Sequence, residues 1–235
     1  MSLTPRKRFW TAARPIAEAG GFGVALDAHP LKTPAGAALV VPSEALAAAI
    51  AAEWDALAGE IRPDRLPLTR AANSAIDRIL PDPGPVADAI ADYGGTDLLC
   101  YRAAAPQALA DRQAAGWDPW LAWAAREFHA PLVAVTGIVH QPQPEASLAA
   151  LRAAVAAYGP FALAGLHGLV ALSGSLVLGL AVARGALAPD AAWELGRLDE
   201  TWQAEHWGLD AEAEAAADAA RADFLDSARL LALLG

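Results

Sequence analysis

Residues 153–183 contain no Asp, Glu, Lys or Arg, and this uncharged stretch limits the possible folds more than any other feature of the chain. An unbroken helix of that length could cross the roughly 30 Å of hydrocarbon in a bilayer. However, Gly159-Pro160 interrupts the stretch near its start, and His167 lies inside it. Ser173-Gly174-Ser175 also offers a helix end followed by a new N-cap.

The uncharged stretch therefore predicts three short helices: one that ends near Tyr158, one over about 161–172 and one over about 175–184. Each is too short to span a bilayer, and helices that are apolar all round are typical of the centre of a helical domain. We expect buried core helices and no integral membrane span, with a span as the alternative reading.

The N-terminal part has the pattern of a small antiparallel sheet. Residues 21–27 alternate weakly, and residues 31–33 and 38–41 are short extended segments separated by Pro and Gly turns. From Ser43, a plausible N-cap, the apolar period becomes helical and predicts a helix over about 43–58. A second helix is expected to begin at Pro67.

The six residues Leu80–Pro85 include three prolines and a glycine, which makes this segment the best linker candidate. We therefore expect an α+β fold, with a small α+β domain over 1–84 and a larger all-helical domain over 85–235. Residues 96–101 and 132–138 could be extended. The remaining helices are expected over 85–93, 106–115, 118–128, 145–157, 190–206 and 211–233.

Charge and cysteine content exclude several classes of function. The formal net charge of −10 opposes binding to a nucleic-acid backbone, so we expect no nucleic-acid partner and favour a protein or a neutral ligand. The single cysteine, Cys100, rules out an intramolecular disulfide framework and indicates a cytoplasmic compartment. Residues 199–226 carry nine acids against one base, which is usually a solvated helix face.

Motifs for catalysis and cofactor binding are missing. The five histidines are scattered without metal-ligand spacing, and Gly20-Gly21-Phe22-Gly23 lacks the third glycine of a dinucleotide site. No GxSxG elbow surrounds any serine. We expect no metal, no cofactor and no enzymatic activity. The alternative is a small-molecule enzyme that uses carboxylates clustered by the fold.

The expected helix over about 190–207 has two unusual faces. Its core stripe is predicted to contain Ala191, Leu195, Leu198, Trp202 and His206, while Glu194, Thr201 and Glu205 lie on a flank. Two tryptophans surround one glutamate on the opposite face. Aromatic anchors beside a charge are typical of protein interfaces, although a helix buried on both sides remains the alternative. This opposite face carries Trp193, Gly196, Glu200, Gln203 and Trp207.

Several segments, in order along the chain, resemble the assembly chaperones of the F-type ATP synthase, which hold the free alpha subunit of its catalytic head. The resemblance covers about residues 22–214. It rests on Val24–Asp27 with Pro30–Pro34, Glu53-Trp54-Asp55, Pro67–Arg78, Thr96–Arg102, Trp117-Asp118-Pro119, Leu172–Ser175 and Asp199–Gly208.

The resemblance implies a small α+β domain followed by a helical one, no cofactor and no turnover. It also implies that the partner is the alpha subunit and that the setting is mitochondrial or alpha-proteobacterial. We expect the bacterial kind, in the cytoplasm, and a monomer when free. The family's important acidic residue belongs to the segment that matches Asp199–Glu205, so Glu200 and Glu205 are both candidates. The family tryptophan at Trp54 is expected to be structural. The predicted partner-binding residues are Glu200, Glu205, Trp193, Gln203 and Trp207.

The chain departs from the family pattern at two places. Ala28-His29 stands where the family commonly has Gly-Arg, and Ala71 where a bulkier Leu is usual. The first departure weakens the case for assigning a partner contact to the hairpin tip around residues 28–29.

Overall fold

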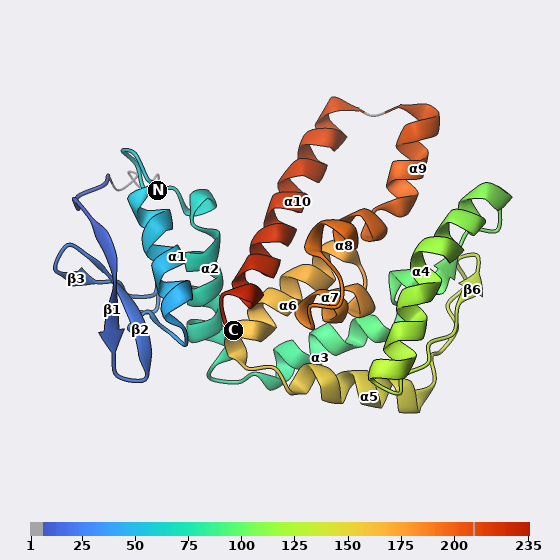
Figure 1. Cartoon of the computed structure of the whole chain (residues 1–235), viewed down its shortest axis with the longest axis horizontal. Coiled ribbons are helices and arrows are strands. Elements are labelled where there is room, and N and C mark those ends of the chain that lie inside the picture. The colour runs from blue at the N-terminus through green and yellow to red at the C-terminus, as the bar shows by residue number, and fades with distance from the viewer. Residues whose placement is uncertain (1–6, 209) are drawn as a thin grey trace. The chain divides into compact units, whose positions relative to one another are not determined.

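The computed structural model describes residues 7–208 and 210–235 (Figure 1). The chain has the predicted α+β fold, with a small antiparallel sheet near the N-terminus and a larger helical part. It divides into two compact units. The first extends to Pro83 and also includes residues 160–165 and 229–235, and the second comprises 84–159 and 166–228. The sequence-based boundary after residue 84 does not anticipate the two later segments that join the first unit.

The first unit contains four strands and two helices. They are β1 (Ala13–Glu18), β2 (Gly21–Leu26), β3 (His29–Pro30), β4 (Val40–Val41), α1 (Glu44–Asp55), a 3-10 turn (Pro63–Arg65) and α2 (Pro67–Ser74), which continues as a π-helical segment (Ala75–Ile79).

The second unit contains the other helices and two short strands. They are α3 (Gly84–Asp92), 3-10 turns (Tyr93–Gly95, Leu98–Cys100), β5 (Tyr101–Arg102), α4 (Gln107–Glu127), β6 (Val135–Thr136), α5 (Glu145–Ala156), α6 (Pro160–Ser173), α7 (Leu176–Ala183), α8 (Pro189–Gly196), α9 (Leu198–Trp207) and α10 (Ala211–Ala232). The beginning of α6 and the end of α10 belong to the first unit.

Strand β2 is the centre of the sheet, because it pairs antiparallel with β1, β3 and β4. The sequence pattern missed β1, whose alternation is interrupted by Pro15. Gly21 is required at the start of β2, since a Cβ there would lie 2.4 Å from the Val41 carbonyl oxygen. Helix α1 packs on this sheet through Leu46 and Ile50, and the Ser43 hydroxyl accepts a hydrogen bond from the Leu46 N–H as the predicted N-cap.

Glu53-Trp54-Asp55 joins α1 to its neighbours. The Glu53 carboxylate accepts hydrogen bonds from the N–H groups of Leu68 (2.6 Å) and Thr69 (3.0 Å), which caps the N-terminus of α2. The Trp54 indole donates to the Thr69 hydroxyl at 3.1 Å and packs on the core of the first unit. Trp54 is therefore structural, as expected.

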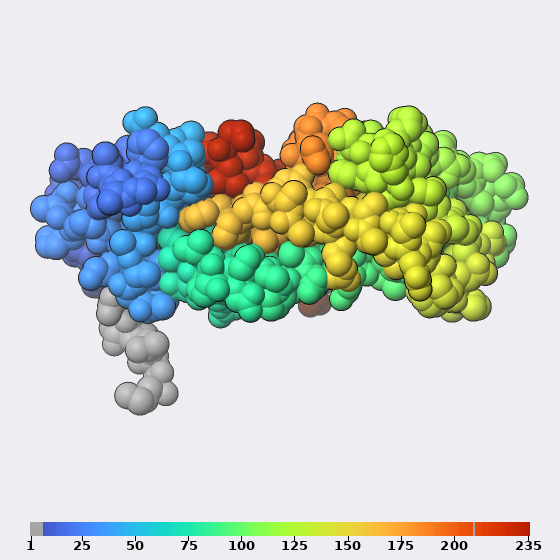
Figure 2. All heavy atoms as spheres, turned by 90° about the horizontal axis from the view of Figure 1, so that it is seen from below, coloured from blue at the N-terminus to red at the C-terminus, as the bar shows by residue number. Residues whose placement is uncertain are grey.

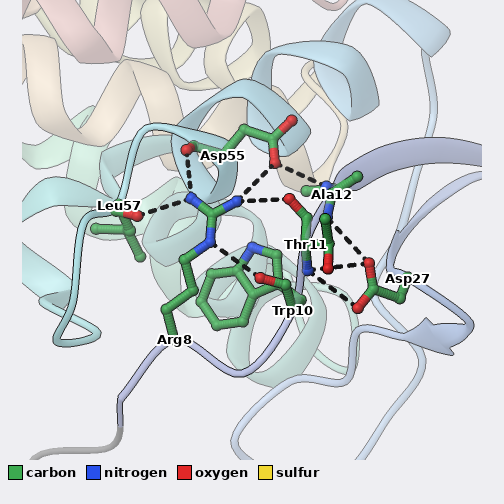
Figure 3. A network of polar contacts seen from close by, with 8 residues as sticks. Arg8, Trp10, Thr11, Ala12, Asp27, Asp55 and Leu57 are labelled. Atoms are coloured by element: carbon green, nitrogen blue, oxygen red, sulfur yellow. Dashed lines mark hydrogen bonds and ion pairs between the residues drawn. The ribbon is translucent and has the colours of Figure 1, made fainter.

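Arg8 fastens the segment that precedes β1 (Figure 3). Its Nη1 donates to the backbone carbonyl oxygens of Asp55 at 2.7 Å and Leu57 at 2.8 Å. On the other side of this segment, the Asp27 carboxylate accepts from the Ala12 N–H at 2.9 Å and from the Thr11 N–H at 3.0 Å. Such backbone hydrogen bonds hold the pKa of Asp27 below its usual value.

The uncharged stretch forms the predicted short helices. Within the second unit, α3 and α5 lie side by side in both views (Figures 1 and 2). Helix α6 ends at Gly174, whose φ of +69° is left-handed, and Ser175 then caps α7 by accepting from the Leu178 N–H at 3.0 Å. Helix α7 is buried from Leu176 to Ala181. None of the helices in residues 7–208 and 210–235 is both long and apolar enough to cross a bilayer.

Asp97 is a fully buried carboxylate at the start of α7. Its Oδ2 accepts from the Val177 N–H at 2.9 Å and its Oδ1 from the Leu99 N–H at 3.0 Å. Burial dominates over these hydrogen bonds and raises the pKa of Asp97 to about 6.

The separate helices expected over 106–115 and 118–128 are wrong, because α4 runs without interruption through Pro119. Proline removes one backbone hydrogen bond, but Pro119 lies on the exposed side of α4. On the buried side, Trp117 and Ala124 are fully covered, and their packing keeps the two halves continuous. Of the segments expected to be extended, 132–138 contains the two-residue strand β6, whereas 96–101 holds a 3-10 turn and only the first residue of β5; the two strands pair parallel.

Candidate functional site

The single helix expected over 190–207 is wrong, because it is broken at Arg197. Its backbone there has φ −114° and ψ 20°, outside the helical region, and the chain changes direction between α8 and α9 (Figure 1). The two helices therefore do not share the faces that a continuous wheel assigns to them.

Trp193 is the first predicted site residue that does not lie where a continuous helix would place it. It lies in α8 with 8% of its surface exposed, its ring centroid 5.5 Å from that of Phe224 in α10. The Arg197 guanidinium covers the ring at 5.6 Å. Trp193 is therefore a packing residue, and the expectation that it lies on an open face is wrong. Gly196, which was expected on the same face, is also buried, because it packs closely against Ser173 of α6.

Helix α9 presents the remaining candidates to solvent. Glu200, Gln203, Glu205 and Trp207 are exposed, and Trp207 has 78% of its surface accessible. Of the ten residues of α9, Leu198 alone is buried. Exposed tryptophans are typical anchors for protein partners.

The predicted core stripe is wrong at its far end. His206 is exposed and stacks on Trp202 with ring centroids 4.3 Å apart. Trp202 is half-buried, and the Arg112 guanidinium of α4 lies 5.9 Å from its ring centroid.

Helix α4 holds α8 and α9 in place through side chains that the sequence analysis did not identify. The Trp117 indole donates to the Leu195 carbonyl oxygen at 2.9 Å, where the end of α8 frees that acceptor. Gln113 Nε2 donates to Asp199 Oδ1 at 2.7 Å, while its Oε1 accepts from the Ala103 N–H at 2.8 Å. Because these partners lie 78 and 86 residues away along the chain, no local pattern reveals them.

The structure distinguishes the two candidate glutamates. Arg112 donates to both Glu205 carboxylate oxygens, at 2.6 and 3.0 Å, and this bidentate pair lowers the pKa of Glu205 and raises that of Arg112. Glu200 makes a longer ion pair with Arg197, at 3.6 Å. Glu205 therefore fastens α9 to α4, whereas Glu200 is more available to a partner.

Acidic and aromatic side chains characterise this region. Within residues 7–208 and 210–235, no three His, Cys, Asp or Glu side chains gather in a way that could hold a metal ion. Among the acids of α9, Glu200 lies on the exposed side, whereas Asp199 and Glu205 bond to α4, and α10 adds Glu212 and Glu214 in its first turn. Such a surface attracts a cationic partner and fixes its orientation.

Comparisons with known proteins identify close relatives. A family model described as ATP12 chaperone protein matches residues 7–125. The crystal structure of Atp12 from Paracoccus denitrificans shares 50% sequence identity, covers 97% of this chain and 98% of its own, and has a TM-score of 0.93. An aspartate-to-lysine mutant of the same Atp12p matches equally. The Atu1473 protein from Agrobacterium tumefaciens, a candidate chaperone, shares 41% identity with a TM-score of 0.94, over 97% of this chain and 86% of its own.

Proposed function

The chain belongs to the ATP12 chaperone protein family, and we propose that it binds the free alpha subunit of the F-type ATP synthase and shields it until it joins its partner subunit. Membership makes the protein an assembly chaperone; the identity of the subunit and the shielding are what we propose. A free subunit exposes surface that later packs against its neighbours, and large bare apolar patches aggregate.

The open face of α9 is the observation that carries this proposal. Trp207 provides an aromatic anchor, and Glu200 and Gln203 provide polar groups beside it. Two connections from α4 to α9, through Glu205 and Asp199, and a third to the end of α8 keep α9 in place without covering this face. A preformed surface of this kind loses little conformational freedom on binding.

The acids of α9 and α10 support a role in capture and release. Their field steers a basic surface toward the site and keeps the free chaperone soluble. Charged contacts at a partly solvated rim fix orientation but add little affinity, so the contact can be displaced. Release then follows when the final subunit partner buries the same patch with a larger area.

Charge reversal at Glu200 is the direct test. Glu200→Lys is expected to retain the far-ultraviolet circular dichroism of the wild type, because this side chain is exposed, and to weaken the capture of purified alpha subunit in a pull-down. Glu18→Lys is the matched control, since it makes the same change in charge on exposed β1. If the folded Glu200→Lys protein captures as much alpha subunit as the wild type, Glu200 is not part of the contact.

The enzymatic alternative has less physical support. A general acid requires a carboxyl with a raised pKa that can reach a substrate. Asp97 has a raised pKa but no exposed surface, and the pKa of exposed Glu205 is lowered. We therefore propose that the protein acts without turnover. We also propose that it is a monomer when free and that it works in the cytoplasm of an alpha-proteobacterium.

A further inference from the structure

A hollow of about 620 Å³ lies in the second unit, between one face of α4 and the helices α8 and α9. Arg112 and Trp120 line it from α4, and Leu195 and Leu198 from α8 and α9. The remaining lining is half apolar and half polar. It comprises Leu187, Ala191, Glu194 and Thr201.

Residue size on the facing helices explains why side chains pack closely at one point and leave space at another. Arg112, Gly116 and Trp120 are four residues apart and share one face of α4. A Cβ at Gly116 would lie 3.0 Å from Leu195 and 3.2 Å from Leu198, so glycine permits this close approach. Ala191, the smallest side chain that lines the hollow, leaves space open in α8.

The hollow is continuous with the candidate contact surface. Thr201 lies at its edge and follows Glu200 directly along α9, and Arg112 joins the hollow to Glu205. A polypeptide that contacts Glu200 therefore passes the opening. Trp120 is half-buried in the wall and offers a large apolar surface with little rotamer entropy to lose.

The charges around the opening specify the kind of occupant. The one cation in the lining, Arg112, is neutralised by its bidentate pair with Glu205. Glu194 lies in the lining, and Glu200 lies beside it on α9 in a 3.6 Å ion pair with Arg197, so that three acids stand against two bases here. The edge is therefore acidic and the interior apolar, which complements an aliphatic side chain flanked by Arg or Lys.

We propose that this hollow receives an aliphatic anchor from a basic segment of the alpha subunit. The inference rests on the proposed function and adds to it a defined subsite. The apolar walls remove the anchor from water, while the acidic edge pairs with the flanking cations. Binding is thus expected to combine a buried contact with a salt-sensitive component.

Filling the hollow tests the proposal. Ala191→Trp is expected to reduce capture of purified alpha subunit by about tenfold or more, the loss typical of a blocked hot-spot contact. Ala122→Trp is the matched control, because Ala122 is an exposed alanine of α4 outside the lining, and it should capture like the wild type. Circular dichroism melting of both variants checks that they fold.

A second variant covers the case in which Ala191→Trp does not fold. Thr201→Lys places a cation at the exposed edge of the hollow and is expected to weaken capture by a similar factor. A benzophenone amino acid at position 201 should crosslink to a basic segment of the alpha subunit, as mapped by mass spectrometry. Capture unchanged in folded Ala191→Trp or Thr201→Lys, or a crosslink to an acidic segment, would overturn the proposal.

The same experiments separate the subsite from the proposed function. If the wild-type protein captures no alpha subunit, the proposed function fails. If the wild type captures it and the folded variants capture it equally, the subsite alone fails. Light scattering gives the oligomeric state of the wild type and of Ala191→Trp. If the wild type is a dimer and Ala191→Trp is a monomer, the hollow is occupied by a second copy of this chain, and the proposal is overturned.

Discussion

Helices α7 and α9 belong to the same unit, are similarly short, and use opposite means of attachment. Helix α7 is buried from Leu176 to Ala181, and its start is closed by Ser175 and Asp97. Helix α9 buries Leu198 alone and depends on polar side chains of α4. Burial on all sides makes α7 part of the core, whereas side-chain attachment along one side leaves the rest of α9 free for a partner.

A charge inside α7 gives the largest expected effect. Leu178→Asp places an unpaired carboxylate at a fully buried position, so we expect the free energy of unfolding to fall by about 4 kcal/mol or more. Gln203→Asp on α9 is the matched surface change and should alter it by less than about 0.5 kcal/mol. Urea unfolding followed by circular dichroism measures both. Equal losses in the two variants would contradict the contrast between the helices.

The pH dependence of stability should report Asp97 at the start of α7. Because folding raises the pKa of Asp97 from 3.8 to about 6, the folded protein binds more protons than the unfolded chain between these values. The contribution of this group is therefore fully present below about pH 4 and is lost as the pH rises through about 6. This loss amounts to about 3 kcal/mol.

Asp97→Asn removes the titrating group and is the variant to compare. The advantage of the wild type over Asp97→Asn in the free energy of unfolding should shrink as the pH is raised from 4 to 7. Urea titrations at each pH measure this difference. A difference that stays constant or grows with pH would show that Asp97 is not held in its protonated form by burial.

The connection between α4 and α8 is expected to be of intermediate size. Trp117→Phe removes the hydrogen bond to the Leu195 carbonyl oxygen and leaves a small void at a fully buried position. We expect a loss of about 2 kcal/mol in the free energy of unfolding. Capture of alpha subunit should also weaken, because α9 follows directly from α8. If thermal unfolding is unchanged, this bond does not hold the end of α8.

The exposed ion pair between α9 and α4 should have the smallest effect on stability. Glu205→Gln retains the shape of the side chain and removes its charge from Arg112, so the melting temperature should change by less than about 2 °C. Capture should fall less than in Glu200→Lys, because Glu205 already has a partner within the chain. Thermal melting and pull-down of the two variants measure both effects. A larger loss of capture in Glu205→Gln than in Glu200→Lys would contradict this prediction.

Local sequence patterns were sufficient to predict most of the helices. The break at Ser173-Gly174-Ser175, the N-cap at Ser43 and the structural role of Trp54 follow from short-range patterns and from the family resemblance. The errors arose where long-range packing overrode a local signal. Pro119 did not end α4, because residues on its other side are buried, and no local signal marked the break at Arg197.

The sequence by itself determined the α+β class, the short buried helices of the uncharged stretch and the acidic C-terminal region, because hydrophobic period and charge are local properties. Only the tertiary structure decided that Trp193 is covered by Phe224 while Trp207 is open, and that Arg112 engages Glu205 from 93 residues away. A helical period shows which residues share a face. Which face is covered depends on neighbours that are distant in the chain, and those neighbours become known only when the chain has folded.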